Sequence, residues 1–118
     1  MKLKPYSKKS PLTVTVRRKD WIRGGYGDSR LLRLADQKMC CLGFAARKIG
    51  FERNQILERL EPNDLGVNIC GLARNGNNTS TANELMCAND DTLMSDKARE
   101  EKIKSLGKRI GLDFRFVG

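Results

Sequence analysis

Two short stretches near the ends of the chain alternate between apolar and polar residues. Every second position is apolar in each of them, which gives the sets Leu12, Val14, Val16 and Leu112, Phe114, Phe116. A period of two residues is typical of a strand with one buried face. We therefore expect a strand at each place. We also expect the last strand to pair with an N-terminal sheet, because its large apolar side chains need cover.

Two further apolar runs, residues 31–34 and 39–41, flank the mostly polar residues 35–38, Ala-Asp-Gln-Lys. A short polar segment between two apolar runs predicts a turn, so this pattern predicts a hairpin. Residues 23–30 come just before it and contain three glycines. Such a glycine-rich segment indicates a loop, because glycine tolerates backbone angles that other residues avoid.

The apolar spacing becomes helical from about Cys41 onward. Leu42, Ala45 and Ile49 fall on one face of a helix, and Gly50 occupies the position of a C-terminal capping glycine. Three more helices are predicted, over residues 54–60, 81–88 and 95–110. Thr81 has the spacing of a capping box, Ser95 is an N-cap candidate and Gly111 ends the last helix. Residues 63–80 read as a loop.

These elements predict an α+β fold. Three N-terminal strands and the C-terminal strand form a small antiparallel sheet, which packs against three or four helices. Residues 1–10 form a basic N-terminal arm, and residues 11–118 form a single domain. A chain of 118 residues is long enough to bury a core without disulfides or a metal.

Positive charge is concentrated in residues 1–48. This part holds thirteen Lys and Arg residues against three Asp, a net charge of +10, while the remainder holds ten against eleven acids, a net charge of −1. An excess of one sign attracts partners of the opposite sign. We therefore expect an anionic partner, either a nucleic acid or nucleotide, or the acidic surface of another protein.

The apolar runs are too short to cross a membrane, and the first ten residues lack the apolar core of a secretory signal. We therefore expect a cytoplasmic protein that does not bind membranes. The four cysteines show no spacing of a secreted disulfide framework, which agrees with this compartment. Nothing in the sequence indicates the oligomeric state.

The candidate ligand site is the glycine-rich loop and the cations around it. Successive backbone N–H groups at glycines can surround an anion, arginines can bond to phosphate, and a tyrosine can stack on a base. The residues assigned to this site are Arg17, Lys19, Arg23, Gly24, Gly25, Tyr26, Arg30 and Lys38. The segment matches neither a P-loop nor a dinucleotide-binding fingerprint. The alternative is a hairpin connection with solvated arginines.

The adjacent pair Cys40 and Cys41 is expected to be structural, because cysteine is among the most buried residue types. The alternative is a reactive thiolate at a helix N-terminus, but the chain contains no His to act as a base. Zinc on the four cysteines, which include Cys70 and Cys87, would lack the spaced ligand pairs of ordinary sites. We therefore predict no metal, no cofactor and no catalytic residue.

Two other features have a structural interpretation first. The run from Asn89 to Asp91 is expected to end a helix and to pair with the basic half, since Asn and Asp favour such positions. A cation site there would need more oxygen ligands at regular spacing. Trp21 is expected in the core, although at the base of the loop it can also wall a pocket.

Several motifs together resemble a group of small uncharacterised proteins encoded by bacteriophages and prophages. The motifs are Trp21-Ile22-Arg23-Gly24, Leu31-Leu32, Met39-Cys40-Cys41-Leu42-Gly43-Phe44 and Asn89-Asp90. The similarity extends over about residues 12–117 and is clearest at 39–44. The resemblance implies a phage setting and carries over no function. Small phage proteins of this kind often counter bacterial defences.

Three function classes follow from these observations. The leading hypothesis is a non-enzymatic phage protein that binds a phosphate-bearing ligand, either nucleic acid or a defence signalling nucleotide, through its basic half. The alternative is an inhibitor that docks on an acidic surface of a defence effector such as a CRISPR complex. The third is a small thiol- or carboxylate-dependent enzyme.

Overall fold

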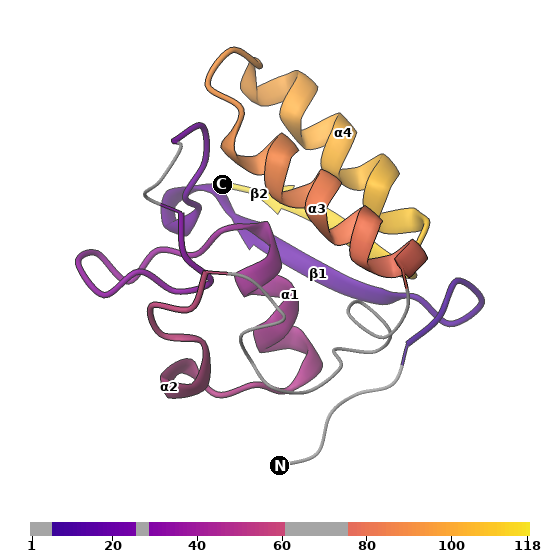
Figure 1. Ribbon diagram of the computed structural model, residues 1–118, viewed down its shortest axis with the longest axis horizontal. Helices are drawn as coiled ribbons and strands as arrows, with labels where there is room; N and C mark the ends of the chain where they lie inside the picture. Colours follow the sequence, from indigo (N-terminus) through magenta and orange to yellow (C-terminus); the bar gives the residue numbers. More distant parts are fainter. Residues whose placement is uncertain (1–5, 26–28, 61–75) are drawn as a thin grey trace.

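A computed structural model describes residues 6–25, 29–60 and 76–118, and Figure 1 shows how the helices and strands are arranged. The elements are β1 (Leu12–Arg17), the 3-10 turn η1 (Arg18–Asp20), α1 (Cys41–Ile49), α2 (Arg53–Ile56), α3 (Gly76–Asp90), α4 (Asp96–Lys108) and β2 (Leu112–Val117). Helix α1 packs on β1, α4 packs on β2, and α3 contacts both of these helices. The fold is α+β.

Within the described residues the sheet has two parallel strands, so the predicted antiparallel sheet with three N-terminal strands is wrong. β1 and β2 pair in register from Leu12 with Leu112 to Arg17 with Val117. The expected pairing of the last strand with the N-terminal strand is confirmed, but its expected direction is not. Alternation identifies the buried face of a strand and leaves its direction open. Here residues 18–111 supply the long crossover that parallel strands need.

The strands predicted at residues 31–34 and 39–41 are not formed. Each segment makes one isolated bridge: Leu32 with Leu57, and Met39 with Trp21. Leu31 and Leu32 are adjacent, and both are fully or almost fully buried. A half-exposed strand buries only alternate residues, so two buried neighbours need cover on both sides. The backbone groups of these segments therefore bond to several parts of the chain and not to one partner strand.

The turn predicted between those segments is present. The Arg33 N–H donates to the Lys38 carbonyl at 2.8 Å, and Gln37 has a φ of 61°. The next residue, Met39, donates its N–H to the carbonyl of Asp20 at 2.9 Å. The turn therefore returns the chain, and Lys38 with it, to the segment that follows β1.

Helix α1 begins and ends where the sequence predicts. Gly50 has a φ of 134°, and its N–H donates to the Ala46 carbonyl at 3.1 Å, as a capping glycine does. Gly43 allows close packing: a Cβ added there would lie 1.8 Å from the carbonyl oxygen of Leu31. Only glycine lets α1 sit this close to the preceding segment.

The later helices agree with the prediction to different degrees. Helix α2 is one turn only, and α3 begins early enough that residues 76–80 of the predicted loop are helical, while residues 61–75 lie outside the described residues. Thr81 is buried within α3 and does not cap it, because the capping spacing also fits a helix interior whose threonine faces the core. Helix α4 is confirmed: the Ser95 hydroxyl accepts the Ala98 N–H at 3.2 Å.

The core lies between the inner face of the sheet and helices α1, α3 and α4. Trp21 is 3% exposed, as predicted, and Phe114 is 1% exposed. Phe116 is half-buried, with its ring centre 4.8 Å from that of Trp21. Tyr6, from the predicted arm, packs against this core, and residues 1–5 lie outside the described residues. Among the described residues no helix is both long and apolar enough to cross a bilayer.

Candidate functional site

One buried amide connects the loop after η1 to α1 and α3. Asn89, near the end of α3, is 1% exposed. Its side-chain oxygen accepts hydrogen bonds from Trp21 Nε1 at 2.8 Å and from the Cys41 backbone N–H at 3.0 Å. Its side-chain nitrogen donates to the Ile22 carbonyl at 2.9 Å, and its backbone carbonyl accepts the Gly24 N–H at 2.8 Å. The glycine-rich segment therefore starts from a fixed point.

A buried arginine lies against the same glycine-rich segment. Arg99 on α4 is 3% exposed, and its guanidinium donates to Asp96 Oδ1 at 2.6 Å and to three backbone carbonyls around the junction of α3 and α4. Its Nη2 atom lies 3.2 Å from the place where a Cβ on Gly24 would stand. Gly24 also has a φ of 67°, so glycine is required there on both counts.

A hollow of about 520 Å³ opens beside this segment, and we name it the glycine-turn cavity. The charged and glycine residues that line it are Arg23, Gly24, Gly25, Arg33, Lys38, Asp96 and Arg99. Four residues assigned to the site from sequence, namely Arg23, Gly24, Gly25 and Lys38, thus line one hollow.

The arginines of the glycine-turn cavity are held by nearby acids. Arg23 Nε lies 3.1 Å from Asp96 Oδ2, and the Arg23 guanidinium lies 4.7 Å from the centre of the Trp21 ring. Arg33 contacts Asp36 at 2.6 Å, and this hydrogen-bonded pair lowers the pKa of Asp36 to about 2. These contacts fix the direction of both guanidinium groups.

The other residues assigned to the site lie elsewhere. Arg30 lines different hollows, and its Nε atom is 3.8 Å from Glu58 Oε1. Arg17 lines a separate groove beside α1, and Lys19 is exposed in η1. Tyr26 lies outside the described residues. The two arginines at the ends of the glycine-rich loop therefore do not converge on one point.

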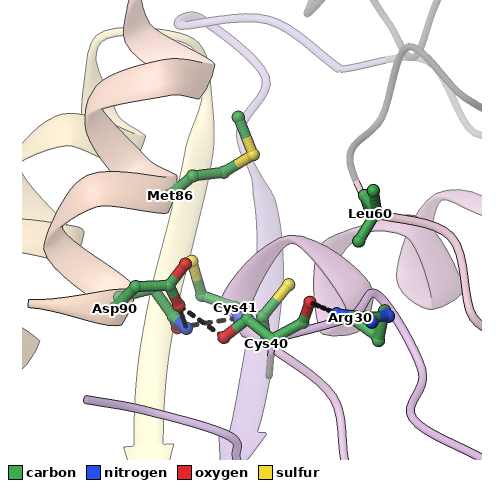
Figure 2. Close-up of a pocket in the computed structure, with 8 residues that line it drawn as sticks. Arg30, Cys40, Cys41, Leu60, Met86 and Asp90 are labelled. Atoms are coloured by element: carbon green, nitrogen blue, oxygen red, sulfur yellow. Dashed lines mark hydrogen bonds between the residues drawn. The ribbon is translucent and has the colours of Figure 1, made fainter. Parts of the chain in front are cut away.

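A smaller hollow of about 180 Å³, drawn in Figure 2, lies where α3 meets the start of α1. Cys40, Cys41, Met86 and Asp90 are among the residues that line it, and the Asp90 carboxylate accepts a hydrogen bond from the Ser29 hydroxyl. Burial raises the pKa of Cys40 to about 11 and raises the pKa of Cys41 well above its usual range. Both thiols therefore stay protonated at neutral pH, which supports a structural role over a nucleophilic one.

The cysteines of the described residues lie in two environments. Cys40 and Cys41 are buried, whereas Cys87 is exposed on α3, and Cys70 lies outside the described residues. Within the part of the chain that the structure describes, no three Cys, Asp or Glu side chains are grouped so that they could hold a metal ion.

Sequence reasoning did not assign the two residues that hold this region together. The sequence predicts that the run from Asn89 to Asp91 ends a helix and pairs with the basic half, and it does not single out Arg99. A signal for Arg99 exists, because it lies on the same helical face as Ile103 and Leu106. A charged residue in an apolar stripe predicts a buried charge with several partners.

Comparisons of the chain with protein-family models, with curated proteins and with solved structures give no match.

Proposed function

We propose that the protein binds a phosphate-bearing ligand, a nucleic acid or a nucleotide, in the glycine-turn cavity. One observation supports this above all: four cationic side chains line a single hollow, Arg23, Arg33, Lys38 and Arg99. Asp96 also lines it, and it pairs with two of these arginines. Cations held at the rim of one hollow are the usual arrangement for binding phosphate oxygens.

The cavity residues have different parts in this binding. Arg23 and Arg33 are already oriented by their acids, so they lose little side-chain entropy when they also donate to a ligand. Lys38 makes no salt bridge with a described residue, and its positive charge also acts on the carboxylate of Asp36. A Cβ at Gly25 would meet nothing within 4 Å, so a ligand can approach the backbone closely there.

The size of the cavity agrees with a small anionic ligand. Its volume of about 520 Å³ lies within the roughly 300 to 1,000 Å³ that small-molecule sites usually enclose. The resemblance to bacteriophage and prophage proteins supports a setting in a host cell, such as the capture of a defence signalling nucleotide. The proposal is for binding and includes no catalytic step.

Titration calorimetry of the full chain with pyrophosphate and with ATP, at low ionic strength, tests the proposal. The informative variant is Lys38→Glu, which removes a cation that has no salt-bridge partner among the described residues. We expect its affinity to fall by about 10- to 100-fold, because a charge-assisted hydrogen bond is worth roughly 1.5 to 3 kcal/mol. The matched control is Lys102→Glu on the exposed face of α4, and we expect it to bind almost as the unaltered chain does.

Two results would contradict the proposal. Equal loss of affinity in both variants would mean that only net charge matters. If neither probe binds at low ionic strength, the ligand is not a phosphate compound of this size. Docking on an acidic surface of a host defence protein would then be the better explanation of the basic half.

A further inference from the structure

A second basic hollow, of about 300 Å³, lies between β1, α1 and α2, and we name it the basic groove. Its polar lining residues are Thr15, Arg17, Arg47, Lys48 and Arg53. Met39 and Phe44, each 8% exposed, complete the lining as an apolar floor. Among the described residues no acid lines the groove, and it shares no lining residue with the glycine-turn cavity.

The local structure explains why these cations point into one place. Thr15 and Arg17 are exposed on β1, where they alternate with the buried Val14 and Val16. Arg47 and Lys48 occupy the last turn of α1, where the helix dipole favours positive side chains. Because α1 packs on β1, this turn lies beside the strand.

Two of the four cations have only weak acidic partners. Arg17 Nε is 3.5 Å from Asp20 Oδ2, and the Arg17 side chain is 65% exposed. Arg47 Nη1 is 3.8 Å from Glu52 Oε2, and the Glu52 side chain is 73% exposed. Long ion pairs in solvent contribute little, so a phosphate replaces the carboxylate at small cost.

The other two cations have no salt bridge with a described residue. Arg53 Nη2 donates to the amide oxygen of Gln37 at 2.7 Å, which orients the guanidinium without neutralising it. Lys48 is exposed in the last turn of α1. The groove therefore keeps most of its charge for a ligand.

We infer that the basic groove is a second anion-binding site and that it holds the sugar-phosphate backbone of a nucleic acid. Guanidinium groups donate in pairs to phosphate oxygens, and three of the four cations are arginines. The apolar floor of Met39 and Phe44 suits the sugar and base that accompany each phosphate. An acidic peptide would use the cations and leave this floor without a partner.

Fluorescence anisotropy with a short fluorescein-labelled single-stranded oligonucleotide, over a series of salt concentrations, tests this inference on the full chain. The groove variant is Lys48→Glu with Arg53→Glu. The matched control is Lys102→Glu with Lys104→Glu, which makes the same change in net charge at exposed positions of α4. Circular dichroism verifies that each variant is folded.

We expect the groove variant to bind at least about 100-fold more weakly at low salt, and the control to change less than about fivefold. The slope of log K against log salt should also fall by about 1.4, because each phosphate contact to a single strand contributes about 0.7. If the double variant does not fold, Lys48→Glu alone should weaken binding by about 10-fold.

Three results would overturn the inference. An equal loss in the groove variant and the control would show an effect of net charge alone. Binding of a poly-glutamate peptide as tight as that of the oligonucleotide would remove the case for nucleic acid. A loss in Lys38→Glu as large as in the groove variant would place the strand in the glycine-turn cavity. The two proposals fail separately: ATP affinity that does not change in Lys38→Glu would contradict binding in the glycine-turn cavity and would not contradict the groove, because the two hollows share no lining residue.

Discussion

The glycine-turn cavity and the basic groove each present four cationic side chains to a hollow, but the two sets are held differently. In the cavity the arginines contact carboxylates at 2.6 to 3.1 Å, and Arg99 is 3% exposed. In the groove the two ion pairs measure 3.5 and 3.8 Å and involve exposed side chains. The basic residues of the chain are therefore of two kinds: some are held in close ion pairs within the fold, and others face solvent.

The difference has consequences for ligands. Fixed guanidinium groups around a glycine turn favour one small anion in one orientation, because the side-chain entropy has already been lost. Loosely paired arginines along an open groove favour a flexible polyanion, whose binding depends strongly on salt. Most of the variants below change buried residues that support the two hollows, and one changes a cation of the glycine-turn cavity.

The largest effect is expected for Asn89→Ala, which removes the buried amide under the glycine-turn cavity. The Trp21 and Cys41 N–H groups and the Ile22 carbonyl would lose their partners. We expect chemical denaturation to show a loss of about 3 to 5 kcal/mol in the free energy of unfolding, because each buried unpaired group costs about 1 to 3 kcal/mol.

The matched control is Asn83→Ala on the exposed side of α3, which should change stability by less than about 0.5 kcal/mol. If the two asparagine variants are equally stable, Asn89 does not have the central role that its hydrogen bonds indicate.

A somewhat smaller loss is expected for Gly43→Ala, which acts on the basic groove by moving α1. Its Cβ would stand 1.8 Å from the Leu31 carbonyl oxygen, so helix or backbone has to shift. We expect a loss of about 3 kcal/mol, at the upper end of overpacking effects. Gly25→Ala is the control, because its Cβ meets nothing within 4 Å and its φ is not positive. A thermal melt in which both variants match the unaltered chain would refute the close packing of α1.

Because the thiols of Cys40 and Cys41 are buried, we expect the free energy of unfolding to fall in alkali. The pKa of Cys40 is raised by burial to about 11, above the ordinary value of about 8.5. Its contribution to stability is therefore complete below about pH 8.5 and is lost as the pH rises towards 11. The stability of Cys40→Ala should depend less on pH over this window. An equally steep decline in that variant would show that other groups cause it.

Alkylation followed by peptide mapping measures the same burial at neutral pH. Cys87 is exposed and should be labelled rapidly, whereas Cys40 and Cys41 should be labelled only on unfolding. Rapid labelling of Cys40 and Cys41 in the native protein would contradict a purely structural role for the buried pair.

The smallest effect is local to the turn beside the glycine-turn cavity. The Arg33 guanidinium lowers the pKa of Asp36 to about 2, so this ion pair is present above the ordinary pKa of about 3.9 and is lost as the pH falls towards 2. The carboxyl chemical shift of Asp36 should follow this titration. In Arg33→Gln the midpoint should rise towards the ordinary value, while the Lys38 backbone N–H still donates to the same carboxylate at 3.2 Å. A midpoint that stays low in that variant would assign the shift to another group.

Some local patterns in the sequence predicted local structure correctly, whereas the strands predicted at residues 31–34 and 39–41 are not formed. The alternation at Leu112 to Val117 and the Ser95 cap with its apolar stripe on α4 both reappear in the structure. These features depend on residues a few positions apart, so periodicity and capping are enough. The alternation of apolar residues does not show whether the two strands run parallel or antiparallel, because that depends on how the intervening chain crosses over.

The candidate site shows a similar limit. The cation Arg23 could be predicted from charge, but its acidic partner Asp96 lies 73 positions along the chain. Arg47, Lys48 and Arg53 carried no motif, and only the packing of α1 beside β1 places them with Arg17. Ion pairs between residues far apart in the chain decide which cations face solvent. The spacing of neighbouring residues in the sequence does not show these pairs.

An amide-resolved NMR titration tests the difference between the two basic regions most directly, with ATP and a short single-stranded oligonucleotide added to separate samples of the full chain. We expect ATP to shift the amide signals of Gly24, Gly25 and Lys38, which belong to the glycine-turn cavity. We expect the oligonucleotide to shift those of Thr15 and Lys48 in the basic groove. If both ligands shift the same set of amides, or if neither shifts any, the two hollows are not distinct anion-binding sites.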